Sequence, residues 1–232
     1  MYIRDNVKRI NEDIRQAALA AGRDPAEILL CAATKMNDAQ AVREAIAAGV
    51  DCCGENRVQE LVQKQAEDAY RGAPVHFIGH LQTNKVKQVV GKVDLIQSVD
   101  REALLTAIQK EAQKQGIRQE ILLQVNIAAE ESKGGFTPEE TLHIVENLES
   151  FPNVFVRGLM AIPPVCQNKG DNDKFFREMC NLAVDITAKN SDNVSVDVLS
   201  MGMSDDFADA ISCGSTMIRV GTAIFGRRNY NT

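Results

Sequence analysis

Short apolar runs recur eight times along this chain, and each is followed by a polar or glycine-containing turn and then by a segment with helical spacing. The runs cover residues 28–34, 50–55, 75–80, 95–100, 120–126, 154–162, 196–202 and 217–225. They are continuous rather than alternating, which is typical of parallel strands covered on both faces. Eight strand–helix units within 232 residues predict an α/β fold, a closed (β/α)8 barrel of the TIM type, with an open doubly wound sheet as the alternative.

The whole chain, residues 1–232, is expected to fold as one domain that opens with an amphipathic helix over about residues 3–21. No linker-like stretch divides it. Its 44% of hydrophobic and 25% of charged residues exclude the depleted composition of a disordered chain. The opening helix is expected to pack on the barrel.

Charge and hydropathy exclude several classes of function. The formal net charge is -6 and the chain has no basic stripe interleaved with aromatic residues, so a nucleic-acid partner is not expected. The apolar runs are far shorter than the roughly 20 residues of a membrane-spanning helix, and the N-terminus is charged and has no apolar core segment. The sequence therefore predicts a cytoplasmic protein.

The cysteines and histidines do not form a recognisable ligand motif. Six cysteines are scattered without a CxxC or a cysteine–histidine spacing, and they are expected to be reduced core thiols. A redox pair of Cys52 and Cys53 is the alternative, which is disfavoured because neighbouring side chains on a strand point to opposite faces. His76 and His80 are expected to share one face of the third strand as hydrogen-bonded residues, and no metal site is expected.

Ligands bind at the carboxyl ends of the strands in a parallel barrel, so the residues that close the apolar runs are the candidate site. Lys35 closes the first run. A lysine amine that is partly removed from water has a lowered pKa and adds to carbonyl groups to give a Schiff base. A strand-end lysine that extends into water is the alternative, and the other strand ends decide between the two.

Turns rich in glycine and serine lie at the ends of the seventh and eighth runs, where barrels frequently bind phosphate. Ser200, Ser204 and Thr222 offer hydroxyl donors, and Gly221 allows the backbone to approach a ligand closely. Neither turn has the GxGxxG or the Walker pattern. The two turns therefore predict a phosphate group but not a dinucleotide or a nucleoside triphosphate.

Arg219 lies within the eighth run, where an unpaired guanidinium is costly, so a partner is expected. One candidate partner is the carboxylate of Asp197. The other is a ring nitrogen of a bound cofactor, which Arg219 would keep unprotonated because a guanidinium only donates. A neutral pyridine is a weak electron sink, which suits racemase-like or non-catalytic use better than transamination.

Several motifs, taken together, resemble one known family. They are ATK at 33–35, GENRVQE at 54–60, HFIGHLQTNK at 76–85, QVNIAAEESKGGF at 124–136, GLMAIPP at 158–164, LSMGMSDDFADAI at 199–211 and IRVGTAIFG at 218–226. Over nearly its whole length the chain resembles the YggS/PROSC family of pyridoxal phosphate homeostasis proteins. The resemblance implies a barrel like the N-terminal domain of alanine racemase, a fold-type III enzyme that uses pyridoxal 5′-phosphate (PLP).

The resemblance also implies the roles of six cofactor-binding residues. It places the Schiff base on Lys35, Asn56 beside the cofactor ring and Arg219 against the pyridine nitrogen. It assigns the phosphate to Ser200, Gly221 and Thr222. After the lysine, many members have a proline or a similar turn, whereas this chain reads Met36-Asn37-Asp38, so the shape of this loop is left open.

The family resemblance implies a monomer that acts in intracellular PLP (vitamin B6) homeostasis and amino-acid balance without established turnover. Apo PLP-dependent enzymes are the expected acceptors of the cofactor. One alternative is a PLP-dependent amino-acid racemase, which needs two opposing acid–base groups, and the second domain that supplies one of them in related racemases is not expected here. Another is a Schiff-base aldolase or a phosphosugar-binding barrel that uses Lys35 without PLP.

Overall fold

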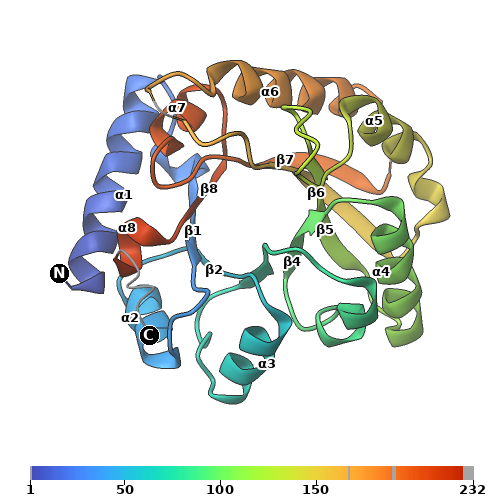
Figure 1. The fold of residues 1–232 in the computed structure, drawn as a ribbon, viewed down its shortest axis with the longest axis horizontal. Helices are drawn as coiled ribbons and strands as arrows, with labels where there is room; N and C mark the ends of the chain where they lie inside the picture. Colours follow the sequence, from blue (N-terminus) through green and yellow to red (C-terminus); the bar gives the residue numbers. More distant parts are fainter. Residues whose placement is uncertain (1, 167, 190–191, 227–232) are drawn as a thin grey trace.

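The computed structural model describes residues 2–166, 168–189 and 192–226, and in these ranges eight parallel strands close into a barrel in chain order (Figure 1). The strands are β1 (Leu29–Ala33), β2 (Cys52–Glu55), β3 (Val75–Phe77), β4 (Leu95–Val99), β5 (Gln119–Val125), β6 (Val154–Ala161), β7 (Val194–Ser200) and β8 (Met217–Val220). Pairing of β8 with β1, in the register Met217 to Leu29, closes the barrel. The (β/α)8 prediction is confirmed, and the open sheet is wrong.

Helices surround the barrel on its outer side (Figure 1). The α-helices are α1 (Ile3–Ala20), α2 (Ala39–Ala47), α3 (Val58–Ala66), α4 (Glu102–Gln115), α5 (Pro138–Glu146), α6 (Asp173–Thr187), α7 (Phe207–Ser212) and α8 (Thr222–Phe225). Three 3-10 helices are also described: η1 (Pro25–Glu27), η2 (Thr83–Gln88) and η3 (Leu148–Ser150). None of the described helices is both long and apolar enough to span a membrane. Residues 1 and 227–232 of the expected domain lie outside the described residues.

Alternation of side chains along each strand divides the core into two parts. Outward residues such as Ala32 and Cys53 pack under the helices, and α1 buries Val7 and Ile10 against this outer layer. Inward residues fill the barrel itself, as in other barrels of this type. They form one buried cluster of Cys31, Ala33, Cys52, Ile78, Leu95, Leu122, Met160, Val198 and Met217. This inner cluster fills the barrel below the carboxyl ends of the strands, where ligands bind in barrels of this type.

Two strands end earlier than the apolar runs predict. The eighth run was expected to continue to residue 225, but β8 ends at Val220 and the chain turns at Gly221, whose carbonyl accepts from the backbone N–H of Phe225 to begin α8. Likewise β3 ends at Phe77. His76 therefore lies in the strand, whereas His80 lies in the following loop, so the prediction that the two share a strand face is wrong.

Candidate functional site

A cavity of about 740 Å³ opens at the carboxyl ends of the strands, which is the size range of small-molecule sites. Five of the six residues predicted to bind a cofactor line this cavity: Lys35, Asn56, Arg219, Gly221 and Thr222. These residues come from the ends of β1, β2 and β8, so the closed barrel brings together positions far apart in the sequence. The sixth residue, Ser200, is not among the residues that line it.

A buried ion pair holds the backbone just before Lys35. Glu55, at the end of β2, is fully buried, and its Oε1 lies 2.6 Å from the Nζ of Lys64 on α3. The same amine donates to the carbonyl oxygen of Thr34 at 2.8 Å, and the Thr34 hydroxyl donates to Glu55 Oε1 at 2.6 Å. The Tyr70 hydroxyl donates to this oxygen at 3.0 Å, and burial beside the carboxylate raises the Tyr70 pKa. This network fixes the position from which Lys35 enters the cavity.

The loop after Lys35, whose shape the sequence leaves open, contains a residue in the left-handed region. Met36 has φ of 62° although it is not glycine, and its backbone N–H donates to Glu60 Oε2 at 2.5 Å. The Asn37 side chain donates to the backbone carbonyls of Thr34 and Lys35 at 3.4 and 3.0 Å. These hydrogen bonds provide the tight turn without a proline.

Asn56 is held at the cavity wall by close backbone packing. A Cβ on Gly79 would lie 2.2 Å from the carbonyl oxygen of Asn56, so only glycine lets the β3 loop approach the end of β2 this closely. The side-chain Oδ1 of Asn56 is buried and has no hydrogen-bond partner. A buried acceptor without a donor is unfavourable, and a ligand N–H or O–H in the cavity would satisfy it.

Arg219 is 6% exposed and reaches into the cavity from β8. Its Nη1 donates to the hydroxyl of Ser200 at 2.6 Å and its Nη2 to the carbonyl of Ala161 at 2.8 Å, both of which are uncharged acceptors. Burial lowers the pKa of Arg219 to about 10, so the group still carries its charge at neutral pH. Asp197 pairs instead with Arg157, and its assignment as the partner of Arg219 is wrong.

Ser200 lies beneath the cavity rather than at its wall. The residue is fully buried, its hydroxyl accepts from Arg219, and it donates to Gln97 Oε1 at 2.6 Å. Ser204, in the loop after β7, lines the cavity instead. Ser200 therefore reaches the cavity through the guanidinium of Arg219, which lines the cavity wall.

Small residues form the end of the cavity where phosphate was predicted. A Cβ on Gly221 would lie 3.3 Å from the Cβ of Ala33, which shows how closely the turn after β8 packs on β1. Thr222 is exposed, and with Gly221 it also lines an adjoining pocket of about 170 Å³ beside Met36. Gly221 and Thr222 therefore offer a close backbone approach and a hydroxyl group at this end of the cavity.

Comparison of the sequence with known proteins shows the family to which the chain belongs. The family described as alanine racemase, N-terminal domain, matches residues 3–229. A pyridoxal phosphate homeostasis protein of Aquifex aeolicus is 42% identical over 226 residues, which cover 97% of this chain and 98% of the relative. The chain belongs to the pyridoxal phosphate homeostasis protein family. The resemblance drawn from the motifs is thereby confirmed.

Solved structures of similar proteins agree with this family assignment. A structure described as an unknown protein from Bifidobacterium adolescentis has a TM-score of 0.90 at 36% identity and covers 96% of this chain and 94% of its own. PipY of Synechococcus elongatus, solved with PLP bound, has a TM-score of 0.79 at 33% identity and covers 92% of this chain and 100% of its own. The family fold is therefore also found in a structure that holds PLP.

The family assignment does not account for the thiols inside the barrel. Cys31, Cys52 and His76 lie together under the cavity, while Cys53 faces the helices, as the alternation of side chains predicts. A hydrogen bond from Cys52 lowers the pKa of Cys31 to about 6 and raises the pKa of Cys52 well above its usual value. All six cysteines are free thiols as predicted, but only Cys31, Cys52 and Cys53 are buried; the other three are partly exposed, so their assignment to the core is wrong.

Reading strand ends alone does not reveal the partners behind the site. Glu55 closes the second apolar run, but its partners Lys64 and Tyr70 lie on or after a helix at no recognisable spacing. Gln97 is buried in the barrel interior and is one of three polar residues in the fourth run, to which the sequence assigned no role. His80 is largely exposed, and its Nδ1 lies 3.1 Å from Asp100 Oδ2, so its predicted hydrogen bonding is confirmed.

Proposed function

We propose that this protein binds PLP as a Schiff base on Lys35 and acts in intracellular vitamin B6 homeostasis and amino-acid balance. The observation that carries the proposal is the meeting of Lys35, Asn56, Arg219, Gly221 and Thr222 in one cavity. The PLP-bound structure of PipY and the names of the homeostasis proteins support it. The lysine amine adds to the aldehyde and water is released as the C=N bond forms; attack by water or another amine reverses the link.

Each polar group of the cavity suits one part of this cofactor. The fixed positive charge of Arg219 faces the pyridine nitrogen as a donor and keeps that nitrogen unprotonated. The buried Oδ1 of Asn56 accepts from the ring side of the ligand. Gly221 and Thr222 leave room for the phosphate and offer it a hydroxyl donor. Ser200 acts through Arg219, whose guanidinium it holds in place.

Lys35→Ala is expected to abolish covalent retention of PLP. The purified protein is reduced with borohydride after its visible spectrum is recorded, and the pyridoxyl-lysine is located by peptide mass. We expect one modified peptide, that of Lys35, in the native chain and none in Lys35→Ala, while circular dichroism shows both folded. A colourless native chain that stays unmodified after incubation with PLP would overturn the proposal and favour a barrel that uses Lys35 without this cofactor.

Asn56→Ala is expected to weaken PLP binding by about tenfold while leaving the free protein as stable as before. Removing a hydrogen bond to the ligand costs about 1–3 kcal/mol, whereas in the free protein the deleted Oδ1 has no partner to lose. PLP affinity is measured by equilibrium dialysis and stability by urea unfolding without PLP. A loss of stability that accounts for the whole loss of affinity would contradict this assignment of Asn56.

We further propose that the protein is a cytoplasmic monomer that passes PLP to apo PLP-dependent enzymes and has no turnover of its own. Racemisation needs an acid–base group on each face of the substrate. Among the described residues that line the cavity, Asp205 is the one carboxylate that could act beside Lys35, and the names of the homeostasis proteins support a role without turnover. In heavy water, we expect no Lys35-dependent deuterium at the α-carbon of alanine. With an apo-enzyme added, we expect transfer faster than free dissociation of PLP.

A further inference from the structure

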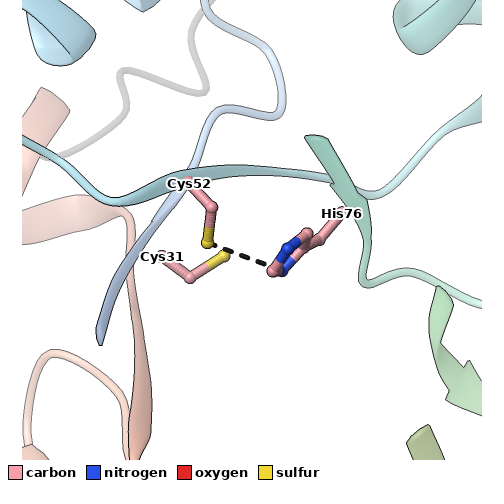
Figure 2. A group of neighbouring side chains, drawn as sticks. All are labelled: Cys31, Cys52 and His76. Atoms are coloured by element: carbon pink, nitrogen blue, oxygen red, sulfur yellow. Dashed lines mark hydrogen bonds between the residues drawn. The ribbon is translucent and has the colours of Figure 1, made fainter. Parts of the chain in front are cut away.

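Three consecutive strands place two thiols and an imidazole together inside the barrel (Figure 2). Cys31 on β1 and Cys52 on β2 are register partners with the same inward direction, and His76 follows on β3. Their ligand atoms all lie within 4.8 Å of one another. The exposed fractions are 0%, 3% and 7%, so the group lies in a dry core.

These three atoms can supply three of the four corners of a tetrahedral zinc site. Bonds of about 2.3 Å to sulfur and about 2.0 Å to nitrogen, at the tetrahedral angle, separate a sulfur and a nitrogen by about 3.5 Å and two sulfurs by about 3.8 Å. The Sγ of Cys52 lies 3.5 Å from Nδ1 of His76, which matches the sulfur–nitrogen separation. The Sγ of Cys31 lies within 4.8 Å of both, so it can reach the same ion by a shift of its side chain.

Charge balance also favours a divalent, thiophilic cation at this place. Two thiolates and Zn²⁺ sum to zero, so the bound group avoids the cost of a net charge in the core. The Zn²⁺ ion itself favours the thiolate form of its cysteine ligands, so the neutral sum applies to the bound site. A hard cation such as Mg²⁺ prefers oxygen ligands and is not served by this set.

We propose that Cys31, Cys52 and His76 form a zinc site in the barrel core. The site is separate from the residues that line the cavity, and the inference does not depend on the proposed function. The three ligands are 21 and 24 residues apart, on different strands, so no short ligand motif marks the site in the sequence.

Gln97 connects this site to the cavity wall. Its Nε2 lies 2.9 Å from Nδ1 of His76, the nitrogen that also approaches Cys52. Its Oε1 accepts from Ser200, whose hydroxyl in turn accepts from Arg219. Zinc and Gln97 compete for the same lone pair, so metal binding displaces Gln97 and changes the hydrogen bonding that holds Arg219.

The test measures zinc in the full chain and in matched variants. Cells are grown with added zinc, the protein is purified under reducing conditions without chelators, and the zinc content is measured by mass spectrometry. We expect about one zinc per chain in the native protein and in Cys53→Ala, a buried neighbour that faces the other way. We expect less than about a tenth of that in Cys31→Ala and Cys52→Ala, because loss of a ligand costs more than the 10- to 100-fold typical of outer groups.

Cobalt gives a second measurement that does not depend on how well each variant retains metal during purification. Protein produced with Co²⁺ is expected to show tetrahedral d–d bands at longer wavelengths than pyridoxal absorbs, and His76→Gln is expected to change their energy and intensity. Circular dichroism establishes that each variant compared is folded. A native chain without zinc and without these bands, or equal zinc in Cys31→Ala and the native chain, would overturn the proposal.

Discussion

Lys64→Met is expected to lower the free energy of unfolding by about 3–5 kcal/mol, because it leaves the carboxylate of Glu55 buried without its countercharge. Glu55 is fully buried, and its Oε2 already has no hydrogen-bond partner. After the substitution, only the hydroxyls of Thr34 and Tyr70 remain as donors to this group. For a chain of this length the midpoint of thermal unfolding is expected to fall by about 10 °C.

Urea unfolding of the PLP-free protein measures this effect, and two comparisons identify its cause. Lys189 and Glu146 form a surface pair at the same 2.6 Å, so Lys189→Met is expected to cost less than about 1 kcal/mol. The double variant Lys64→Met with Glu55→Leu removes both charges and is expected to be more stable than Lys64→Met alone. If the double variant were as unstable as the single one, lost packing and not the buried charge would be responsible.

Gly79→Ala is expected to destabilise the protein by about 3 kcal/mol or more and to weaken PLP binding at least tenfold. The added Cβ would lie 2.2 Å from the carbonyl oxygen, 2.6 Å from the Cα and 2.7 Å from the carbonyl carbon of Asn56. All three are backbone atoms, so a rotamer change of a neighbour cannot relieve the contact. The end of β2 must move, and Asn56 is displaced from its present position at the cavity wall.

Gly116→Ala is the control for this substitution. Gly116 has φ of 67° and nothing within 4 Å of an added Cβ, so its replacement costs only the left-handed backbone conformation, about 1 kcal/mol. Stability is measured by urea unfolding and PLP affinity by equilibrium dialysis. PLP affinity in Gly79→Ala equal to that of Gly116→Ala would contradict the role given to the close approach of Gly79 and Asn56.

The barrel and most of its site were predictable because both depend on the order of residues along single strands. An apolar run marks a strand and its end marks the mouth, which indicates Lys35, and the turns after the last two runs indicate Gly221 and Thr222. The resemblance to the family added Asn56. The prediction of these positions does not require the register between neighbouring strands.

The remaining features depend on strand register, which the sequence does not contain. Ser200 lies below the cavity instead of at its wall because its register partner is Met217, which is the first residue of β8 and belongs to the inner cluster. Asp197, three residues before Ser200, faces outward to Arg157. Cys31, Cys52 and His76 come together only because three strands have the required register. Spacing along the sequence does not predict that register.

The pairing of β1 with β8 also orders the events by which the protein acquires a ligand. Lys35 is translated early and Arg219 late, and the two face one cavity only after the last strand has closed the barrel. Closing so long a loop is slow, since contacts between distant parts of a sequence form late in folding. A ligand that needs both residues therefore cannot assist folding during translation. It binds only to molecules in which the barrel has already closed.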